Sequence, residues 1–290
     1  MIDKIKLNLI RLTGILPLGI ARCLGRLLGT LMSHTNSRNT RVTRINTRLC
    51  FTHLSDDEQQ EHVKRSLQQT CILTLETCVV WARSPQWLLK HTTQKINEAA
   101  MHKAMQANKG VLILAPHLGN WEALGIDMTE YGKLTCMFQP PKQAFLGDFI
   151  YSKRQSYGIH LAPTSAKGVA TCLKALKSGE NVAILPDQNP MQGGGFAPFF
   201  GVQAHTITLI HGLVKRTGCR VIASFAKRVE HGFEIHFVEP HTDIYSQDEQ
   251  TSLNGLNTTI ETCVHACPDQ YQWEYKRFKT QPNSTENRYK

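Results

Sequence analysis

From about residue 94 onward, short apolar runs alternate with longer helical stretches, and this alternation constrains the fold more than any other feature of the sequence. The apolar runs predict strands at 111–115, 134–138, 159–162, 181–185, 220–226 and 233–238. The stretches between them predict helices at 121–130, 145–157, 166–178 and 205–217. Strands and helices in alternation indicate an α/β domain with a mostly parallel central sheet flanked by helices.

The chain divides into three parts. Residues 1–33 are an apolar N-terminal segment, 34–280 form the α/β domain, and 281–290 are a polar tail with no apolar period, which we expect to be disordered. Ser55 and Glu58 form a capping-box pattern that starts a helix running to Ala82. The nine cysteines include no CxxC pair, which fits free and mostly buried thiols in a reducing cytoplasm.

The first 33 residues have the pattern of an amphipathic helix. At roughly 100° per residue, Lys4, Arg11, Arg22 and Arg26 fall within an arc of about 60°, and leucines and isoleucines take the other side. The longest uncharged run, 12–21, is shorter than the ~20 residues of a spanning helix. We therefore expect a helix in the membrane interface with its basic residues toward anionic headgroups, and Pro17 is a candidate kink.

Two alternatives compete with a membrane helix: an amphipathic helix packed on its own domain, and a secretory signal, which the arginines within the apolar run disfavour. The next segment favours surface binding. Its arginines, spaced at threes and fours, would form one basic stripe on a helix: Arg38, Arg41, Arg44 and Arg48. The net charge of +10 also favours polyanionic partners, although a solvated helix face is the commoner explanation of such a stripe.

His117 and Glu122 are the first candidate catalytic residues. His117 follows the strand 111–115, and active sites of parallel sheets collect at the carboxyl ends of strands. Positions five apart face different ways on a continuous helix, so only a turn at Gly119 and Asn120 can bring the two side chains together. A carboxylate bonded to one ring nitrogen makes the other a better base, so this spacing predicts a general base, His117, oriented by Glu122.

A purely structural turn histidine is the alternative to this base. A metal site lacks an HExxH or HxxEH pattern, so we expect no bound metal. The segment 263–267, CVHAC, carries metal-capable side chains without a second cluster, and we interpret it as a buried helix face. The three glycines at 193–195 lack the GK[ST] ending of a phosphate loop, so no nucleotide cofactor is implied.

Four blocks in order resemble the bacterial lipid A biosynthesis acyltransferases, the late lauroyl and myristoyl transferases. They are HLGNWE, YSKRQSYGIHLAPTSAKGVATCLKALKSGENVAILPDQNP, GGGFAPFFGVQAHT and NTTIETCVHACPDQYQWEYKRFK. Together they span most of the chain. The resemblance implies a glycerol-3-phosphate-acyltransferase-like fold at the cytoplasmic face of the bacterial inner membrane. It also implies transfer of a fatty acyl group from acyl carrier protein to a hydroxyl of a phosphorylated lipid A precursor, with no cofactor beyond the acyl thioester.

The resemblance also implies residue roles. The family's His-x4-Asp/Glu dyad matches His117 and Glu122, and its central arginine matches Arg154 ahead of Gly158. The DQ pair matches Asp187 and Gln188 in a substrate-binding region. Further matches are Phe199 to Gly201, Trp273, Arg277, Phe278 and Lys279.

Physical chemistry adds expectations for the same residues. Attack on a thioester creates an oxyanion, for which the backbone N–H groups of Gly119 and Asn120 are candidate donors. Arg154 would hold a substrate phosphate or neutralise developing charge, unless it is an ordinary surface arginine. For Asp187 we favour a structural role, capping the loop 193–195 or orienting Arg154.

Other functions fit parts of the pattern. An acyltransferase acting on another glycolipid or on an aminolipid would use the same chemistry. A noncatalytic basic protein that binds membranes is a second alternative. Nucleic-acid binding would suit the charge, but no nucleic-acid motif accompanies it, so we expect no nucleic-acid partner.

Overall fold

The computed structural model describes residues 2–190, 193–282 and 287–289. The seven strands of the central sheet have the spatial order β1-β9-β8-β2-β5-β3-β4. Their bounds are β1 Thr92–Ile96, β2 Val111–Leu114, β3 Leu134–Phe138, β4 Ile159–Pro163, β5 Asn181–Ile184, β8 Arg220–Val229 and β9 Gly232–Val238. All neighbours run parallel except β8 and β9, which form an antiparallel hairpin. The predicted α/β class with a mostly parallel sheet is confirmed.

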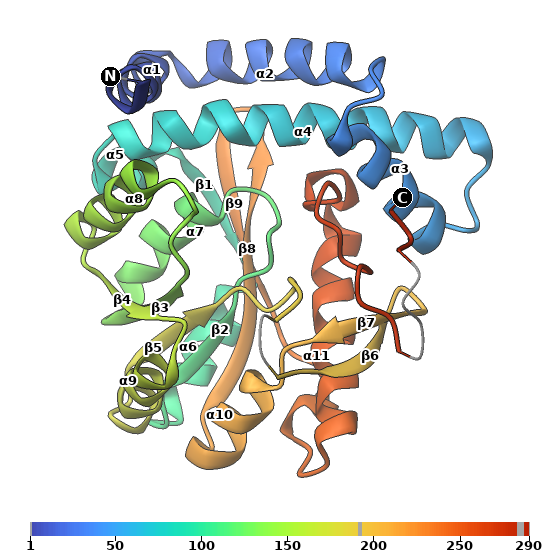
Figure 1. Ribbon diagram of the computed structural model, residues 1–290. Coiled ribbons are helices and arrows are strands. Elements are labelled where there is room, and N and C mark those ends of the chain that lie inside the picture. The colour runs from blue at the N-terminus through green and yellow to red at the C-terminus, as the bar shows by residue number, and fades with distance from the viewer. Residues whose placement is uncertain (1, 191–192, 283–286, 290) are drawn as a thin grey trace.

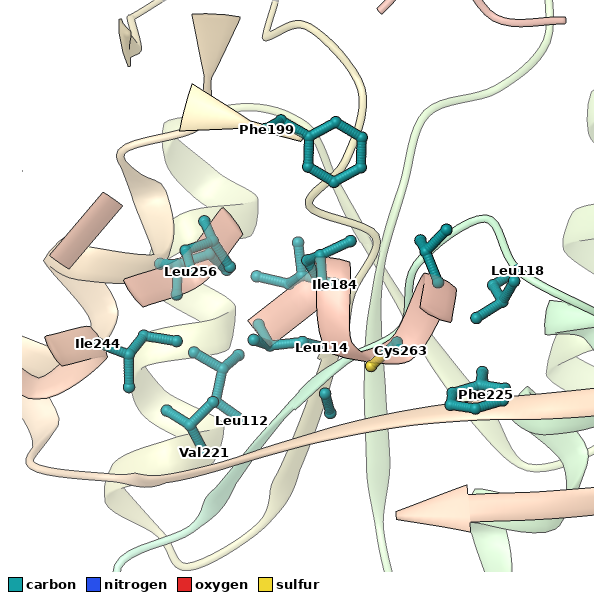
Figure 2. Packing of buried hydrophobic residues seen from close by; sticks show 14 of the residues in the cluster. Leu112, Leu114, Leu118, Ile184, Phe199, Val221, Phe225, Ile244, Leu256 and Cys263 are labelled. Carbon is teal, nitrogen blue, oxygen red and sulfur yellow. The ribbon is translucent and has the colours of Figure 1, made fainter. Parts of the chain in front are cut away.

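Helices cover both faces of this sheet (Figure 1). Their bounds are α1 Ile2–Ile15, α2 Leu18–Ser33, α3 Arg38–Cys50, α4 Asp56–Ala82, α5 Pro85–His91, α6 Glu98–Gln106, α7 Trp121–Met128, α8 Ala144–Ser156, α9 Ala166–Lys177, α10 Leu209–Thr217 and α11 Glu249–Ala266. Leu112 and Leu114 of β2 face a core shared with α9, α10 and α11 (Figure 2). Val111 and Ile113 face a second core shared with α6 and α7. Strand β2 is thus buried on both faces, as its uninterrupted apolar sequence predicts.

The predicted capping box at the start of α4 is confirmed, because the Ser55 side chain accepts from the backbone of Glu58 and the Glu58 side chain accepts from the backbone of Ser55. The helix predicted at 205–217 is wrong at its start. Strand β7 (Val202–Thr206) occupies those residues, paired antiparallel with β6 (Gly195–Phe199) in a separate ribbon. Thr206 is held there by the side chains of Asn257 and Arg277, which lie more than fifty residues away. Contacts from distant segments therefore overrode the local helical pattern.

The N-terminal segment forms two helices rather than one. α1 and α2 meet at Pro17 with a bend of 119°. α2 lies along α4 at the top of the molecule, and α1 crosses the end of α4 near Ala82 (Figure 1). Gly25 and Gly29 let α2 approach α4 closely, because a Cβ at Gly29 would lie 2.3 Å from the Gln68 Cα. No single helix within the described residues is long and apolar enough to cross a membrane, although the bent pair Asp3–Ile15 and Leu18–Ser33 passes by length and composition.

Helix α2 differs from the prediction at Arg22, whereas Arg26 and the leucines are exposed. Arg22, expected to face headgroups, is 6% exposed and points into the protein. The large apolar side chains point outward, and nearly all of the exposed large hydrophobic residues of the described chain lie on α1 and α2: Ile5, Leu9, Leu12, Ile15, Ile20, Leu24, Leu27, Leu28 and Leu31. The glycine side of α2 packs on α4, so its leucine side is left without a protein partner.

Other expectations concern single segments. The basic residues Arg38, Arg41 and Arg48 lie on the exposed side of α3, as the spacing predicts. Cys263 and Cys267 are buried at the end of α11, where CVHAC was interpreted as a buried helix face. All cysteines except Cys23 and Cys78 are buried. Residues 283–286 and 290 of the tail lie outside the described residues.

The last described residues depart from the disordered tail expected from their composition. The Tyr289 side chain is buried, and its hydroxyl donates to Asn46 Oδ1 of α3 at 2.6 Å. The same hydroxyl accepts the Phe278 backbone N–H. The Tyr289 side chain therefore holds these last described residues against the domain. A prediction from average polarity could not detect the effect of one aromatic side chain.

Candidate active site

His117 lies where the carboxyl ends of two neighbouring strands meet. It follows β2, and Asp187 follows β5, which pairs in parallel with β2. The His117 ring donates from Nδ1 to Asp187 Oδ1 at 2.8 Å, and the His117 backbone N–H donates to Oδ2 of the same carboxylate at 2.9 Å. Sheet topology thus joins two residues that are 70 positions apart in the sequence.

Asp187 is suited to hold a protonated or polarised imidazole. It is 4% exposed. Burial alone would raise the pKa of this carboxyl, but the charge and hydrogen bonds of His117 outweigh burial and hold its pKa below the ordinary value. Asp187 is therefore an ionised carboxylate that faces Nδ1. The contact places the ring proton on Nδ1 and leaves Nε2 as the nitrogen with a free lone pair.

Nε2 of His117 faces Gln188. The Gln188 side-chain amide lies 3.3 Å from Nε2 and donates to Gln272 Oε1 at 2.8 Å. The His117 ring also packs edge-on against Trp121, with ring centroids 5.0 Å apart. An amide donor therefore faces the nitrogen that would accept a proton, and an aromatic ring packs against the imidazole.

Glu122 does not make the contact with His117 that the sequence spacing suggested. Its carboxylate accepts from Arg154, with Nε to Oε2 at 3.1 Å and Nη2 to Oε1 at 2.5 Å, and no hydrogen bond joins it to His117 among the described residues. Glu122 lies in the first turn of α7 and Arg154 near the end of α8. Across this turn the carboxylate faces α8, and the orienting position beside the ring belongs to Asp187.

The Glu122–Arg154 pair borders an apolar cavity, with Glu122 buried and Arg154 partly exposed. Burial opposes the positive charge of Arg154, but the adjacent Glu122 carboxylate outweighs burial and raises the pKa of the guanidinium. Trp121 belongs to the same cavity wall, and the cavity is otherwise lined by strand and helix side chains that include Ile113, Leu124, Met137 and Leu185. Trp121 therefore contacts the His117 ring and also lines the cavity beside the ion pair. Arg154 is a paired, largely covered arginine and not an ordinary surface residue.

Gly119 and Asn120 do not offer the free backbone donors that the sequence suggested. The Gly119 N–H donates to the Gln270 carbonyl at 3.1 Å, and the Asn120 N–H donates to the Ala226 carbonyl at 2.9 Å. Gly119 has φ +64°, and a Cβ there would lie 1.9 Å from the Ala226 oxygen. The turn therefore lies directly against β8, and both of its N–H groups are already hydrogen-bonded, one to Ala226 of β8 and one to Gln270. Its glycine is required by both conformation and space.

Asn120 instead caps the helix that follows. Its side-chain oxygen accepts the Ala123 backbone N–H at 3.0 Å, and its side-chain amide donates to Glu76 Oε1 of α4 at 2.8 Å. Glu76 was not predicted as a site residue, because no nearby residue in the sequence indicates its partner more than forty positions away. A carboxylate within an otherwise apolar helical run, CILTLETCVV, was the signal available.

Within the described residues, no group of three or more His, Cys, Asp or Glu side chains is arranged to hold a metal ion. The side chains at the carboxyl edge of the sheet are an imidazole, a carboxylate, amides and one ion pair. This set can move a proton and bind polar groups.

Comparison with known proteins gives a consistent picture. A family model described as bacterial lipid A biosynthesis acyltransferase matches residues 2–280. The chain is 26% identical over 282 residues to the lipid A biosynthesis lauroyltransferase of Escherichia coli (strain K12), covering 94% of this chain and 90% of that protein. It is 24% identical to the palmitoleoyltransferase of the same organism, covering 92% and 87%. It is also 24% identical to the myristoyltransferase, covering 87% and 79%.

Proposed function

Since the chain belongs to the bacterial lipid A biosynthesis acyltransferase family and is an acyltransferase of lipopolysaccharide synthesis, we propose that it transfers a fatty acyl group from acyl carrier protein to a hydroxyl of a lipid A precursor. The observation that carries the mechanism is the His117–Asp187 contact at the carboxyl edge of the sheet. We assign His117 as the general base and Asp187 as the residue that orients it. We also assign the chain to the glycerol-3-phosphate-acyltransferase-like fold.

The reaction follows from the proton positions. Asp187 holds the ring proton on Nδ1, so Nε2 takes the proton of the acceptor hydroxyl while the hydroxyl oxygen attacks the thioester carbonyl carbon. The resulting tetrahedral intermediate collapses with cleavage of the C–S bond. The carrier thiolate leaves and takes the proton back from Nε2. Protons and bonds balance, and the base is regenerated with no added cofactor.

Gln188 has a defined role in these reaction steps. Its amide approaches the Nε2 lone pair, so an incoming hydroxyl must take that position. Gln188 then has an N–H free to donate to the oxyanion of the intermediate, while its other N–H stays on Gln272. We assign this donor role to Gln188 because the backbone N–H groups of Gly119 and Asn120 are bonded to carbonyls.

Glu122 supports the site through Arg154. The two side chains tie the start of α7 to α8, beside the cavity that Trp121 shares. We propose that this pair keeps Trp121 against the His117 ring and keeps the cavity beside the reacting centre apolar. Glu122 is therefore a positioning residue in this scheme and not the partner of the base.

The surface supports a membrane setting. The exposed leucines and isoleucines of α1 and α2 form one apolar surface, which a bilayer interface would cover. The basic stripe on α3 lies close in sequence, and cytoplasmic leaflets are anionic. We propose that the protein binds the cytoplasmic face of the inner membrane. Its formal charge of +10 also suits an acidic carrier protein.

The direct test is acyl transfer by detergent-solubilised protein, with acyl carrier protein thioester as donor and a lipid A precursor as acceptor. Mass spectrometry of lipid A from a deletion strain then reports which acyl group is missing. An unchanged acylation pattern contradicts the proposal. An unchanged lipid A pattern with one other glycolipid or aminolipid losing an acyl group would move the same chemistry to that acceptor.

A further inference from the structure

A second pocket, of ≈ 480 Å³, lies between α2, α4 and the turn that joins β8 to β9. Its polar lining is mostly basic: Arg22, Arg26, Gln69, Arg228 and Glu230. Three arginines from two distant parts of the chain meet here, with one carboxylate at the rim. The pocket is separate from His117 and Asp187, which are not among its lining residues.

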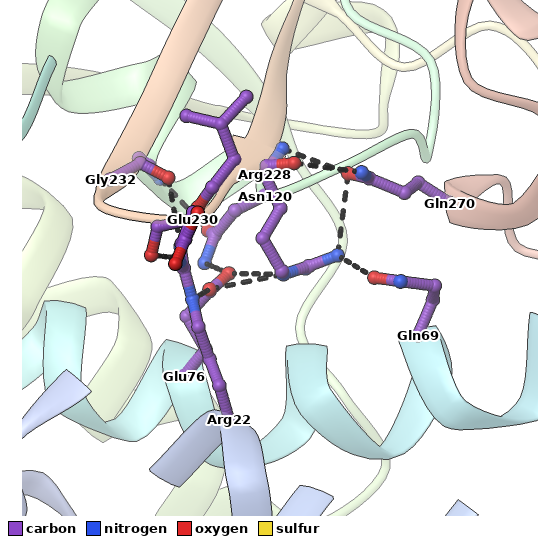
Figure 3. A network of polar contacts seen from close by, with 10 residues as sticks. Arg22, Gln69, Glu76, Asn120, Arg228, Glu230, Gly232 and Gln270 are labelled. Carbon is purple, nitrogen blue, oxygen red and sulfur yellow. Dashed lines mark hydrogen bonds and ion pairs between the residues drawn. The ribbon is translucent and has the colours of Figure 1, made fainter. Parts of the chain in front are cut away.

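One buried carboxylate serves two of these arginines (Figure 3). Glu76 of α4 is fully buried and accepts from Arg22 Nε at 2.6 Å and from Arg228 Nε at 3.0 Å. Burial would raise the pKa of Glu76, but Arg228 and Arg22 outweigh burial and lower it, so the carboxylate carries one negative charge. Two guanidinium groups against one carboxylate leave one positive charge over. An uncompensated buried charge is costly, and a bound anion would offset it.

The hydrogen-bond donors of the pocket are also incompletely used. Arg22 donates from its Nη groups to the backbone carbonyls of Val229, Glu230 and Gly232. Arg228, which is 8% exposed, donates from Nε and Nη1, but its Nη2 has no hydrogen-bond partner in the part of the chain that the structure describes. Arg26 is exposed and makes no side-chain hydrogen bond or ion pair among the same residues. Arg26 thus has donors open at the pocket, and Arg228 has one further donor that is buried and unpartnered among the described residues.

The position of the pocket indicates what kind of anion it takes. Arg26 and Cys23 form its edge on α2, and their neighbours Leu24 and Leu27 belong to the exposed apolar surface. Guanidinium donors beside an apolar surface of this kind match a phosphate group at the level of lipid headgroups. We propose that this pocket binds the phosphomonoester of a lipid, namely the phosphorylated acceptor. This inference rests on the proposed function, since the acceptor is taken from it.

The floor of the pocket touches the catalytic turn. Arg228 bonds Glu76, and Glu76 Oε1 accepts from the side-chain amide of Asn120. Gln270 bonds Arg228 through its side chain and Gly119 through its carbonyl. A phosphate bound at Arg26 and Arg228 would therefore be linked through Glu76 and Gln270 to the segment that positions His117.

A binding experiment tests the pocket without any assay of acyl transfer. The vesicles consist of a neutral lipid mixed with either phosphatidic acid, a phosphomonoester, or phosphatidylglycerol, a phosphodiester, at matched total charge. Flotation then measures whether the protein prefers the phosphomonoester. We expect Arg26→Gln to lower binding to phosphatidic acid vesicles about tenfold or more, the effect of one charged hydrogen bond, and to change phosphatidylglycerol binding little. Cys23→Asp, which places a negative charge at the pocket edge, should act in the same direction.

Arg11→Gln is the matched control, because Arg11 is an exposed arginine of α1 outside the pocket. Equal losses for Arg11→Gln and Arg26→Gln, or equal binding of the two lipids by the wild type, would overturn the proposal in favour of general charge attraction. Inorganic phosphate tests whether the pocket binds free phosphate rather than a lipid phosphate. If it raises the melting temperature through Arg26 without any preference among vesicles, the site takes free phosphate and the lipid assignment is wrong.

Kinetics then link the pocket to the acceptor. With phosphorylated acceptor, Arg26→Gln should raise KM about tenfold and leave kcat near the wild-type value; with dephosphorylated acceptor, wild type and variant should have equal KM. A KM increase that is the same for both acceptors overturns the phosphate assignment. Absence of acyl transfer by the wild type would contradict the proposed function, while the vesicle preference would still report on the pocket.

Discussion

Asp187 contacts His117 twice, through the ring Nδ1 at 2.8 Å and through the backbone N–H at 2.9 Å. One carboxylate therefore fixes both the ring orientation and the turn that carries it. This double contact, between residues that follow neighbouring parallel strands, distinguishes Asp187 from every other acidic residue at the sheet edge.

The first prediction follows from this contact. His117→Ala should lower kcat about 10²- to 10⁴-fold, because it removes the base. Asp187→Asn should also lower kcat at least about 10²-fold, because an amide cannot hold the imidazole tautomer in the same way. Acyl transfer from acyl carrier protein measures both.

The chain contains a matched control for this pair. The Asp269 carboxylate lies 2.9 Å from His62 Nδ1, a second carboxylate–imidazole contact outside the candidate site. Asp269→Asn should leave kcat near the wild-type value. If Asp269→Asn and Asp187→Asn lower kcat equally, the role assigned to Asp187 is wrong.

The Glu122–Arg154 pair allows a double-mutant cycle. Glu122→Gln leaves a guanidinium that is only 17% exposed without its counter-charge, so a loss of about 3–5 kcal/mol in unfolding free energy is expected. The variant Glu122→Gln with Arg154→Gln should lose less than the sum of the single changes, with a coupling of about 0.5–3 kcal/mol. Urea unfolding followed by circular dichroism measures all four proteins. Strictly additive losses would show that the two side chains do not act as a pair.

Gly119 should be far more sensitive than a glycine of the same conformation in open space. Gly119 has φ +64° and Gly218 has φ +63°, but only Gly119 has a backbone oxygen at the position of an added Cβ. Gly218→Ala should cost about 1 kcal/mol, the cost of placing a side chain in the left-handed region. Gly119→Ala should lower the melting temperature several times more and abolish acyl transfer. Equal effects would mean that conformation alone explains the glycine.

The pH dependence of stability should reveal Glu76. Its pKa in the folded protein lies below the ordinary value of 4.5, so its ionised form stabilises the fold above that pH, and the stabilisation is lost as pH falls through the folded-state pKa. Glu76→Gln should destabilise the protein by about 3–5 kcal/mol at neutral pH. The difference from the wild type should shrink as pH falls below 4.5.

Glu61→Gln is the control for Glu76, since Glu61 is a half-exposed carboxylate on the same helix with only surface ion pairs. Its unfolding free energy should differ from the wild type by less than about 1 kcal/mol at all pH values. A constant difference between Glu76→Gln and the wild type down to acidic pH would contradict the assigned charge of Glu76.

The apolar surface of α2 gives the final prediction. Leu27→Gln with Leu31→Gln should weaken vesicle binding, because each leucine contributes about 1.5–3 kcal/mol when fully buried in an apolar phase. The two side chains are 56% and 57% exposed, so the melting temperature in detergent should stay near the wild-type value. Unchanged flotation with vesicles would mean that this surface serves another purpose.

Local patterns predicted the centre of the sheet because its strands are apolar on both faces. β2 and β5 are buried throughout and were recognisable from four letters each. β1, with the sequence TTQKI, is half exposed at the sheet edge, and the ribbon of β6 and β7 contains Gly195 and Pro198. These strands depend on partners far along the chain, so a local reading did not detect them.

The candidate site also combines features that the local sequence predicts with a contact that depends on distant segments. His117 was recognisable because it follows a strand, and Asp187 follows one too. What the sequence could not supply was the order of strands in space, which makes β2 and β5 neighbours. Without that order, Glu122 was the nearest carboxylate along the chain, and the partner of the ring was assigned by proximity in sequence.

The buried position of Arg22 has a consequence for the order of events during synthesis. Arg22 bonds the carbonyl of Val229, 207 positions later, and that of Gly232, 210 positions later. Helix α4, on which α1 and α2 pack, is synthesised soon after them, but the carbonyl partners of Arg22 are synthesised much later. Until the β8–β9 turn has been synthesised, the Arg22 guanidinium cannot make its carbonyl contacts, so the final position of α2 is completed only after most of the α/β domain has been translated.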